Sequence, residues 1–248
     1  MLYHLIKYLS LHFDIPGAGM FLSLSFRAAM GIILALVIGM IFGKRIIRML
    51  QRRQIGEEIR NLGLEGQLQK RGTPTMGGII ILASILIPIL LFGDLTNIYV
   101  LLMIVSTVWL GLIGFLDDYI KIVMKRSEGL NPIQKLIGQF IITGIFTYYL
   151  MTSGDVGTGM LIPFTGGFEN GYYLNLGWLF VPAVFFIVLG TDNGVNFTDG
   201  LDGLCTSVTI LVATFFTVVA IGEDSGISPI TGAVVGSLLG FLLFNVYP

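Results

Sequence analysis

Charged residues are scarce in this chain: only 12% of its 248 residues are Asp, Glu, Lys or Arg, against about 25% in soluble domains. The single cysteine, Cys205, excludes an internal disulfide, and the two histidines, His4 and His12, have no third metal ligand nearby. The net charge of -1 argues against a nucleic-acid partner, because neutralising phosphates requires a basic face. The remaining composition, 54% hydrophobic, indicates an integral membrane protein.

The hydrophobic residues fall into long runs, each close to the ~20 residues with which a helix crosses a bilayer. The fold class expected is therefore all-α, a polytopic membrane helix bundle. Glycines repeat every fourth residue in the first and last runs (Gly39 and Gly43; Gly232, Gly236 and Gly240), a spacing that favours close helix packing. The seven expected spans are Phe21–Gly43, Met76–Gly93, Asn97–Leu116, Leu136–Thr152, Leu176–Thr191, Leu204–Gly222 and Ile230–Tyr247.

The basic residues predict the orientation of these spans. Of 14 Lys and Arg residues, eight lie in 44–75 and four in 117–135, and none follows Lys135. Both segments fall on one side by the parity of the spans, and the positive-inside rule makes that side cytoplasmic, with the N-terminus outside. Residues 44–63 interleave basic and apolar residues, which is typical of a helix lying against anionic lipid headgroups.

Three polar clusters interrupt the apolar runs, at 70–78, at 117–118 and at 196–203. Consecutive clusters are separated by an even number of spans, so all three are expected at the cytoplasmic face. A protein that only spans the membrane has no need to gather carboxylates, a lysine and glycines at one face. We therefore expect an enzyme that works at the membrane surface.

The second cluster, Asp117-Asp118, places two carboxylates at the edge of a span, where such groups are functional candidates. An ordinary helix pair between Asp117 and Lys121, four residues apart, would explain the first carboxylate. Asp118 lies roughly 100° further round the helix and is left without that explanation. Adjacent carboxylates repel unless a cation or protonation relieves them, and a divalent metal is the simpler explanation here.

The third cluster combines Asn196, Asp199 and Asp202 with two glycines before the sixth span. Thr198 is expected to cap the helix, and the spacing of three places both aspartates on one face. Capping explains one or two of these residues but not the whole set. The glycines add backbone that a ligand can approach closely.

The first cluster carries Lys70 and Arg71 ahead of Thr73 and Pro74, which suit a helix cap and the first helical position. A helix start offers free N–H groups and partial positive charge to an anion, and the two cations add donors for phosphate. A capped span with basic flanks would look the same. Together with two acidic clusters, however, it indicates a metal-dependent reaction on a phosphorylated substrate.

Residues 70–78, 114–121 and 196–204 resemble the phospho-N-acetylmuramoyl-pentapeptide transferase family (translocase I) of the polyprenyl-phosphate sugar-1-phosphate transferases. The resemblance implies a bacterial plasma-membrane enzyme of peptidoglycan synthesis with its active site facing the cytoplasm. It implies transfer of phospho-N-acetylmuramoyl-pentapeptide from its UDP derivative to undecaprenyl phosphate, giving lipid I and UMP, with Mg2+. Membrane lipids are implied neighbours, and a homodimer stays open.

The resemblance also implies roles for individual residues. Asp117 and Asp118 are the catalytic and metal-associated carboxylates, with Asp117 as the base toward the lipid phosphate. A phosphate monoester is already mostly dianionic at neutral pH, its second pKa being ~6, so we expect these carboxylates to orient metal and nucleophile instead. The residues implied for the nucleotide-sugar pocket are Lys70, Thr75, Asn196, Phe197, Asp199 and Asp202, with Phe197 on the uracil side.

Relative to the family, a further Asp-containing glycine-rich loop that supplies the main metal ligand, and a histidine-rich loop, do not occur in this sequence. We therefore expect 1–248 to be the N-terminal part of a single transferase domain of about ten spans, which makes its activity alone doubtful. Three alternatives stay open. They are a UDP-N-acetylglucosamine transferase to a polyprenyl phosphate, a cation-coupled transporter, for which carboxylates at one edge fit poorly, and an inactive truncated paralogue.

Overall fold

The computed structural model describes residues 1–52, 76–124, 129–153, 157–162, 164–166 and 170–246. These residues are mostly helical, and five helical segments are long and apolar enough to cross a membrane by length and composition. The protein is thus a multi-pass membrane protein. The five segments are Leu24–Leu50, Ile98–Ile122, Gly177–Thr198, Leu204–Gly222 and Ser228–Asn245.

The chain divides into two compact units, described separately below. Unit 1 comprises Met1–Leu130 and Asp199–Pro248, and unit 2 is Asn131–Thr198. The helices of unit 1 are α1 (Leu2–His12), α2 (Ala18–Leu22), α3 (Leu24–Arg52), α4 (Gly78–Phe92), α5 (Ile98–Val123), α8 (Leu204–Gly222) and α9 (Ser228–Asn245). Unit 2 contains α6 (Pro132–Thr152), β1 (Gly159–Leu161), β2 (Tyr173–Asn175), the short 3-10 helix η2 (Gly177–Leu179) and α7 (Phe180–Thr198).

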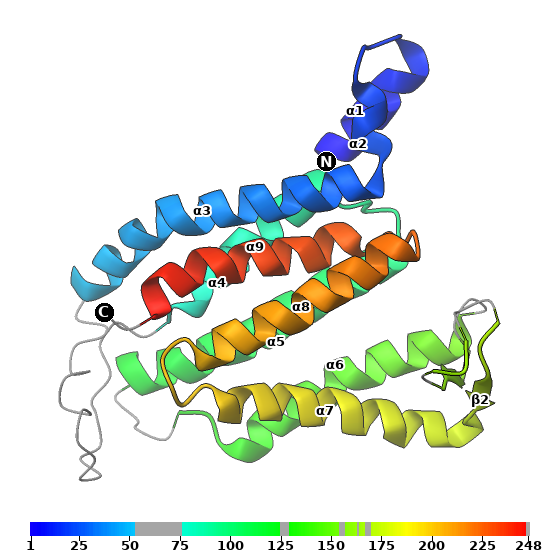
Figure 1. Cartoon of the computed structure of the whole chain (residues 1–248). Helices are drawn as coiled ribbons and strands as arrows, with labels where there is room; N and C mark the ends of the chain where they lie inside the picture. The colour runs from blue at the N-terminus through cyan, green and yellow to red at the C-terminus, as the bar shows by residue number, and fades with distance from the viewer. Residues whose placement is uncertain (53–75, 125–128, 154–156, 163, 167–169, 247–248) are drawn as a thin grey trace. The chain divides into compact units, whose positions relative to one another are not determined.

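The closest helix packing in unit 1 joins α3 and α9, which run side by side in the same direction (Figure 1). A Cβ on Gly236 would overlap the carbonyl oxygen of Ile32, and one on Gly39 would lie 3.2 Å from the Cα of Gly240. Gly43 is covered by the ring of Phe244. The predicted packing role of the glycines is confirmed, because only residues without side chains let the two backbones approach this closely.

The core of unit 1 lies where α3, α4, α5 and α9 meet. α4 runs antiparallel to α9, and the Ser237 hydroxyl donates to the carbonyl of Ile81 at 3.0 Å. α9 begins with a proline at its first turn, a position where the missing N–H costs nothing. The fully or almost fully buried apolar residues of this core are Ala35, Ile85, Ile89, Val100, Ile230 and Ala233.

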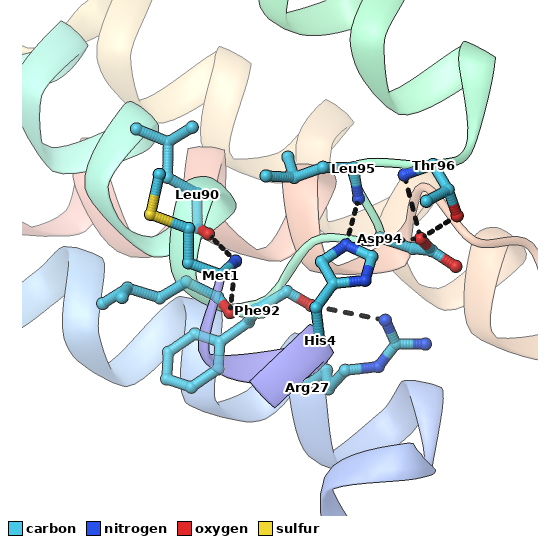
Figure 2. Close-up of polar contacts among 9 residues, drawn as sticks. Met1, His4, Arg27, Leu90, Phe92, Asp94, Leu95 and Thr96 are labelled. Atoms are coloured by element: carbon cyan, nitrogen blue, oxygen red, sulfur yellow. Dashed lines mark hydrogen bonds and ion pairs between the residues drawn. The ribbon is translucent and has the colours of Figure 1, made fainter. Parts of the chain in front are cut away.

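This arrangement gives unit 1 two ends. One end, here called the Arg27 end, joins the start of α3 to the end of α4, because Arg27 donates to the carbonyl of Phe92 at 3.3 Å (Figure 2). The other, called the Asp117 end, holds the ends of α5 and α9 and the starts of α4 and α8. Contacts of Gly77 with Phe241 and of Gly203 with Asn245 join the termini of α4, α8 and α9.

Unit 2 is built on α6 and α7. α6 begins with a capping box, in which the Asn131 side chain accepts from the backbone of Ile133 while the Gln134 side chain accepts from the N–H of Asn131. Between the two helices β1 and β2 pair antiparallel, with Met160 opposite Leu174. The expectation of an all-helical chain missed this pair. Its segments lie outside the apolar runs, where extended backbone satisfies its hydrogen bonds by pairing.

Five of the seven expected spans correspond to helices that are long and apolar enough to cross a membrane, and the other two do not. α4 has 15 residues, about 22 Å of helix, which is shorter than a bilayer core of ~30 Å. α6 has 21 residues but is not among the five apolar segments. α3 continues past Gly43 through Lys44 and Arg48 to Arg52, so the basic segment expected after the first span starts as part of the same helix.

Candidate active site

Asp117 and Asp118 lie on α5, which continues past them to Val123 instead of closing at Leu116. The helix starts cleanly because the Asn97 side chain accepts from the N–H of Tyr99 at 2.9 Å. The helical residues beyond the apolar run are enough to place Lys121 one turn after Asp117. The local sequence therefore determines which basic residue can reach the first carboxylate.

Asp117 is buried, with 7% of its surface exposed, and its carboxylate has partners on both oxygens. Lys121 Nζ lies 2.8 Å from Oδ2, and the N–H of Leu130 donates to Oδ1 at 2.8 Å. The i to i+4 pair considered from the sequence is therefore present, and a backbone contact from beyond the helix adds to it. A buried carboxylate is stable only when it is paired in this way.

The contact with Leu130 depends on Gly129, which has a positive φ of 64°. A Cβ at this position would overlap Asp117 Oδ1 and the end of the Lys121 side chain. Glycine thus permits both the left-handed turn and the close approach of the chain to the carboxylate. Sequence reasoning missed this residue, since Gly129 looks like any loop glycine.

Asp118 is half-buried and follows Asp117 by one residue, so its side chain leaves the helix in a different direction. Among the described residues no three His, Cys, Asp or Glu side chains gather as metal ligands would. The metal predicted at Asp117 and Asp118 stays a prediction. Lys70 and Thr75 lie outside the residues that the structure describes.

The third predicted cluster spans the end of α7 and the start of α8. Thr198 does not cap α8: it is the last residue of α7, and its hydroxyl donates back to the carbonyl of Gly194 at 2.8 Å. α8 begins only at Leu204, after Gly203 with a φ of 75°. The capping prediction was wrong because threonine inside a helix often bonds the preceding turn.

The candidate binding residues of this cluster have accessible side chains. Asn196 and Phe197 are exposed at the end of α7 in unit 2, and the exposed fraction of Phe197 is 85%. Asp199 and Asp202 are exposed in the loop before α8 in unit 1. Each side chain is therefore accessible to a ligand at the end of its own unit.

Asn245, the last residue of α9, holds the loop that carries Asp199 and Asp202. Its Oδ1 accepts from the N–H of Gly203 at 3.0 Å and from the hydroxyl of Thr206 at 2.9 Å. Gly203 and Thr206 are both buried, so this amide satisfies donors that would otherwise lack a partner. Sequence reasoning missed Asn245, although a lone amide at the end of an apolar run was a usable signal.

Comparison with known proteins agrees with the motifs. Residues 100–248 match glycosyl transferase family 4, and residues 70–82 match the phospho-N-acetylmuramoyl-pentapeptide-transferase signature 1. The phospho-N-acetylmuramoyl-pentapeptide-transferase of Flavobacterium psychrophilum is 41% identical over the whole of this chain and 74% of its own length. Those of Parabacteroides distasonis and Porphyromonas gingivalis are 40% identical, each over 71% of its length.

The resemblance expected from three short motifs is thus confirmed over the full length of the chain, which spans about three quarters of these relatives. The matched regions include Asp117 and Asp118, the 196–203 cluster and Asn245. On this evidence the chain belongs to the phospho-N-acetylmuramoyl-pentapeptide-transferases of glycosyl transferase family 4.

Proposed function

We propose that this protein transfers phospho-N-acetylmuramoyl-pentapeptide from its UDP derivative to undecaprenyl phosphate, giving lipid I and UMP in peptidoglycan synthesis. The observation that carries the proposal is the Asp117 end of unit 1. A buried, lysine-paired carboxylate on α5 lies at the same end as the exposed Asp199 and Asp202 loop. The reaction is that of the family to which the chain belongs, and the charged groups at the Asp117 end suit it.

The reaction needs positioning and charge stabilisation more than a strong base. An oxygen of the lipid phosphate attacks the β-phosphorus of the nucleotide sugar, and the bond from that phosphorus to the bridging oxygen breaks as UMP leaves. The attacking phosphate, with a second pKa of ~6, is already mostly dianionic at neutral pH. No proton has to be removed from it before it attacks.

The contacts of Asp117 suit this requirement. Its carboxylate is bound by Lys121 and by the N–H of Leu130, so it serves to hold the lysine in place. The Lys121 side chain is 41% exposed, and an ammonium has three N–H donors, of which Asp117 occupies one. We assign the remaining donors of Lys121 to a phosphate of the substrates.

Mg2+ prefers carboxylate oxygens, and the two aspartates fit such an ion unequally. Asp118 fits as one ligand. Asp117 fits poorly, because its Oδ2 already lies 2.8 Å from the Lys121 ammonium, and this ammonium would repel a second cation on the same carboxylate. Mg2+ held beside Asp118 would supply neutralisation of the diphosphate charge, and every other role above belongs to side chains of this chain.

The nucleotide sugar is assigned to the 196–203 cluster together with Lys70 and Thr75. The exposed ring of Phe197 offers a face on which uracil can stack, and Asn196 offers both a donor and an acceptor. Asp199 and Asp202 can accept hydrogen bonds from hydroxyl groups of the sugars. The Asn245 amide keeps the backbone of their loop in place.

The membrane topology proposed with this function is that of the sequence analysis. Seven spans place the N-terminus outside and the three clusters at the cytoplasmic face of the bacterial plasma membrane. The concentration of Lys and Arg in 44–75 and 117–135 supports this orientation. UDP-sugars are cytoplasmic, so the Asp117 end would open to the compartment that supplies the donor.

UMP release by membranes containing the chain tests the proposal. The assay supplies UDP-N-acetylmuramoyl-pentapeptide, undecaprenyl phosphate and Mg2+, with Asp118→Asn as the matched control. We expect release from the intact chain and a loss of about 100-fold or more in the control. Equal release by both proteins, or release only with UDP-N-acetylglucosamine as donor, would contradict the proposal.

A further inference from the structure

A polar network joins α6 to α7 within unit 2, away from the residues assigned above. Gln139 Nε2 donates to Oδ2 of Asp192 at 2.5 Å, and Asn193 Nδ2 donates to Gln139 Oε1 at 3.1 Å. The same Asn193 amide also donates to the carbonyl of Leu189 at 2.8 Å. One residue of α6 is thus bound by two neighbouring residues of α7.

The direction of these hydrogen bonds is determined. Both donors of the Asn193 amide are in use, so Gln139 must present its oxygen to Asn193 and its NH2 group to Asp192. The chain of donors therefore ends on the carboxyl group of Asp192, which accepts from Gln139. Asp192 lies half-buried inside the apolar segment Gly177–Thr198, where an ionisable side chain is costly and needs a reason.

The network sets the rotation of α7 about its own axis near its end. α6 and α7 also meet where the rings of Phe140 and Phe185 lie 5.1 Å apart, and apolar rings alone tolerate slippage. Hydrogen bonds to Asp192 and Asn193 do not, because a shift by one residue turns a helical side chain by about 100°. Asn196 follows Asp192 by four residues and so lies on the same face, one turn closer to the end of α7.

We propose that the network of Gln139, Asp192 and Asn193 positions Asn196 for the nucleotide sugar. Asp192 and Gln139 are positioning residues that act through α7 and do not touch the substrate. This inference rests on the proposed function, which assigns Asn196 to the donor pocket. It adds two residues, Gln139 on α6 and Asp192 near the end of α7, to those on which donor binding depends.

A set of exchanges at the two positions tests the inference through binding of UDP-N-acetylmuramoyl-pentapeptide to the purified full chain, measured by calorimetry without turnover. Gln139→Glu removes the NH2 donor and sets two carboxylates against each other, so we expect binding weaker by about tenfold. Adding Asp192→Asn supplies an amide that donates to the new carboxylate on α6, and binding should return to within about threefold of the wild type. Gln134→Glu is the matched control on the same helix: its carboxylate still accepts from Asn131, so binding should not change.

A second double variant separates positioning from stability. Gln139→Leu with Asp192→Leu replaces the contact between these two residues by apolar side chains that pack between the helices, while Asn193 keeps its hydrogen bond to the carbonyl of Leu189. We expect this protein to keep its melting temperature and yet to bind the donor about tenfold more weakly, because α7 is free to slip. A purely structural network would give unchanged binding wherever the melting temperature is kept.

The results distinguish the two levels of the argument. If the wild type binds the donor, any one of three results overturns the positioning role alone. These results are an unaffected Gln139→Glu variant, no recovery of binding when Asp192→Asn is added to it, and full binding by the Gln139→Leu, Asp192→Leu variant. Absence of donor binding by the wild type overturns the proposed function, and the positioning role with it. Both the proposed function and the positioning role are supported if Gln139→Glu weakens donor binding, adding Asp192→Asn restores it, and the Gln139→Leu, Asp192→Leu variant binds the donor more weakly.

Discussion

The two ends of unit 1 use their charged residues differently. At the Arg27 end the charges are enclosed by the chain itself: Arg27 is 4% exposed, donates to the carbonyl of Phe92 and stacks over the ring of Tyr3 at 4.0 Å. At the Asp117 end the buried carboxylate holds a lysine whose side chain is 41% exposed, and Asp199 and Asp202 in the loop before α8 are exposed as well. Charged groups that contact only other parts of the chain indicate a structural role, and charged groups that a ligand can reach indicate a binding site.

The N-terminal helix α1 also packs at the Arg27 end (Figure 2). His4 on α1 accepts from the N–H of Leu95 at 3.0 Å and lies 3.6 Å from Asp94. Asp94 in turn accepts from the N–H and the hydroxyl of Thr96. α1 therefore packs onto the loop between α4 and α5 through contacts of His4 with Asp94 and Leu95, which leave few polar groups to bind a ligand.

The largest effect on activity is expected from removing the charge of Asp117 at the Asp117 end. Asp117→Asn keeps the shape of the side chain but releases Lys121, so UMP release should fall by about 100-fold. Because we assign Asp117 a holding role and not that of a base, the loss should persist across the pH range. A pH–rate profile of the variant measures this, and full recovery at high pH would show that Asp117 acts as a base.

The next effect concerns the support of the acidic loop. Asn245→Ala leaves the buried N–H of Gly203 and the hydroxyl of Thr206 without their acceptor, which should cost about 1–3 kcal/mol of unfolding free energy. Donor binding should weaken as well, because the loop carries Asp199 and Asp202. Thermal unfolding and calorimetric titration measure the two effects. Asn245→Asp keeps the accepting oxygen and serves as the control; equal losses in both variants would contradict this role.

Removing the charge of Arg27 at the Arg27 end should affect the stability of the protein but not its binding of the donor. Arg27→Met removes the hydrogen bond to Phe92 and the stacking on Tyr3, with an expected cost of about 2 kcal/mol. Donor binding per folded molecule should stay at the wild-type value, since no candidate binding residue lies among the described residues at this end of unit 1. A loss of donor affinity without loss of stability would refute the distinction between the two ends.

The smallest effect is a dependence of stability on pH. Burial alone would raise the pKa of Asp94, but hydrogen bonds from Thr96 and the nearby His4 and Lys7 lower it below its ordinary value. The stabilisation is therefore fully present above the unfolded pKa of about 4 and is lost as the pH falls through the lower folded value. Thermal melts from about pH 6 to about pH 3, a window that brackets the unfolded pKa, should show a smaller decline for Asp94→Asn than for the wild type.

The sequence was sufficient for what depends on local pattern. Apolar run length predicted seven spans, of which five are long apolar helices in the structure, and the spacing of glycines predicted close helix packing, which occurs between α3 and α9. The spacing of Asp117 and Lys121 was enough to raise their pairing as one explanation of the first carboxylate, and the pair is present. Motif order was enough to indicate the family, since three short segments in one order carry more information than composition.

Other features depended on partners far away in the chain. Asn245 meets Gly203 across 42 residues, and Gln139 meets Asp192 across 53. A lone amide in an apolar run can be noticed in the sequence, but no local pattern identifies its partner, because that partner lies dozens of residues away in the chain. Thr198 was misassigned for a related reason: a cap and a bond to the preceding turn use the same hydroxyl, and only the observed end of α7 distinguishes them.

By itself the sequence determined the class of the protein, its family and the residue types of the candidate site, since these follow from hydrophobicity and short motifs. The tertiary structure alone decided how charge is used at each end of unit 1. Whether a carboxylate is free to bind a ligand depends on which groups the fold brings within about 3 Å of it. For Asp117 those groups are Lys121 and the N–H of Leu130, and the second is available only because Gly129 turns the chain back onto the helix.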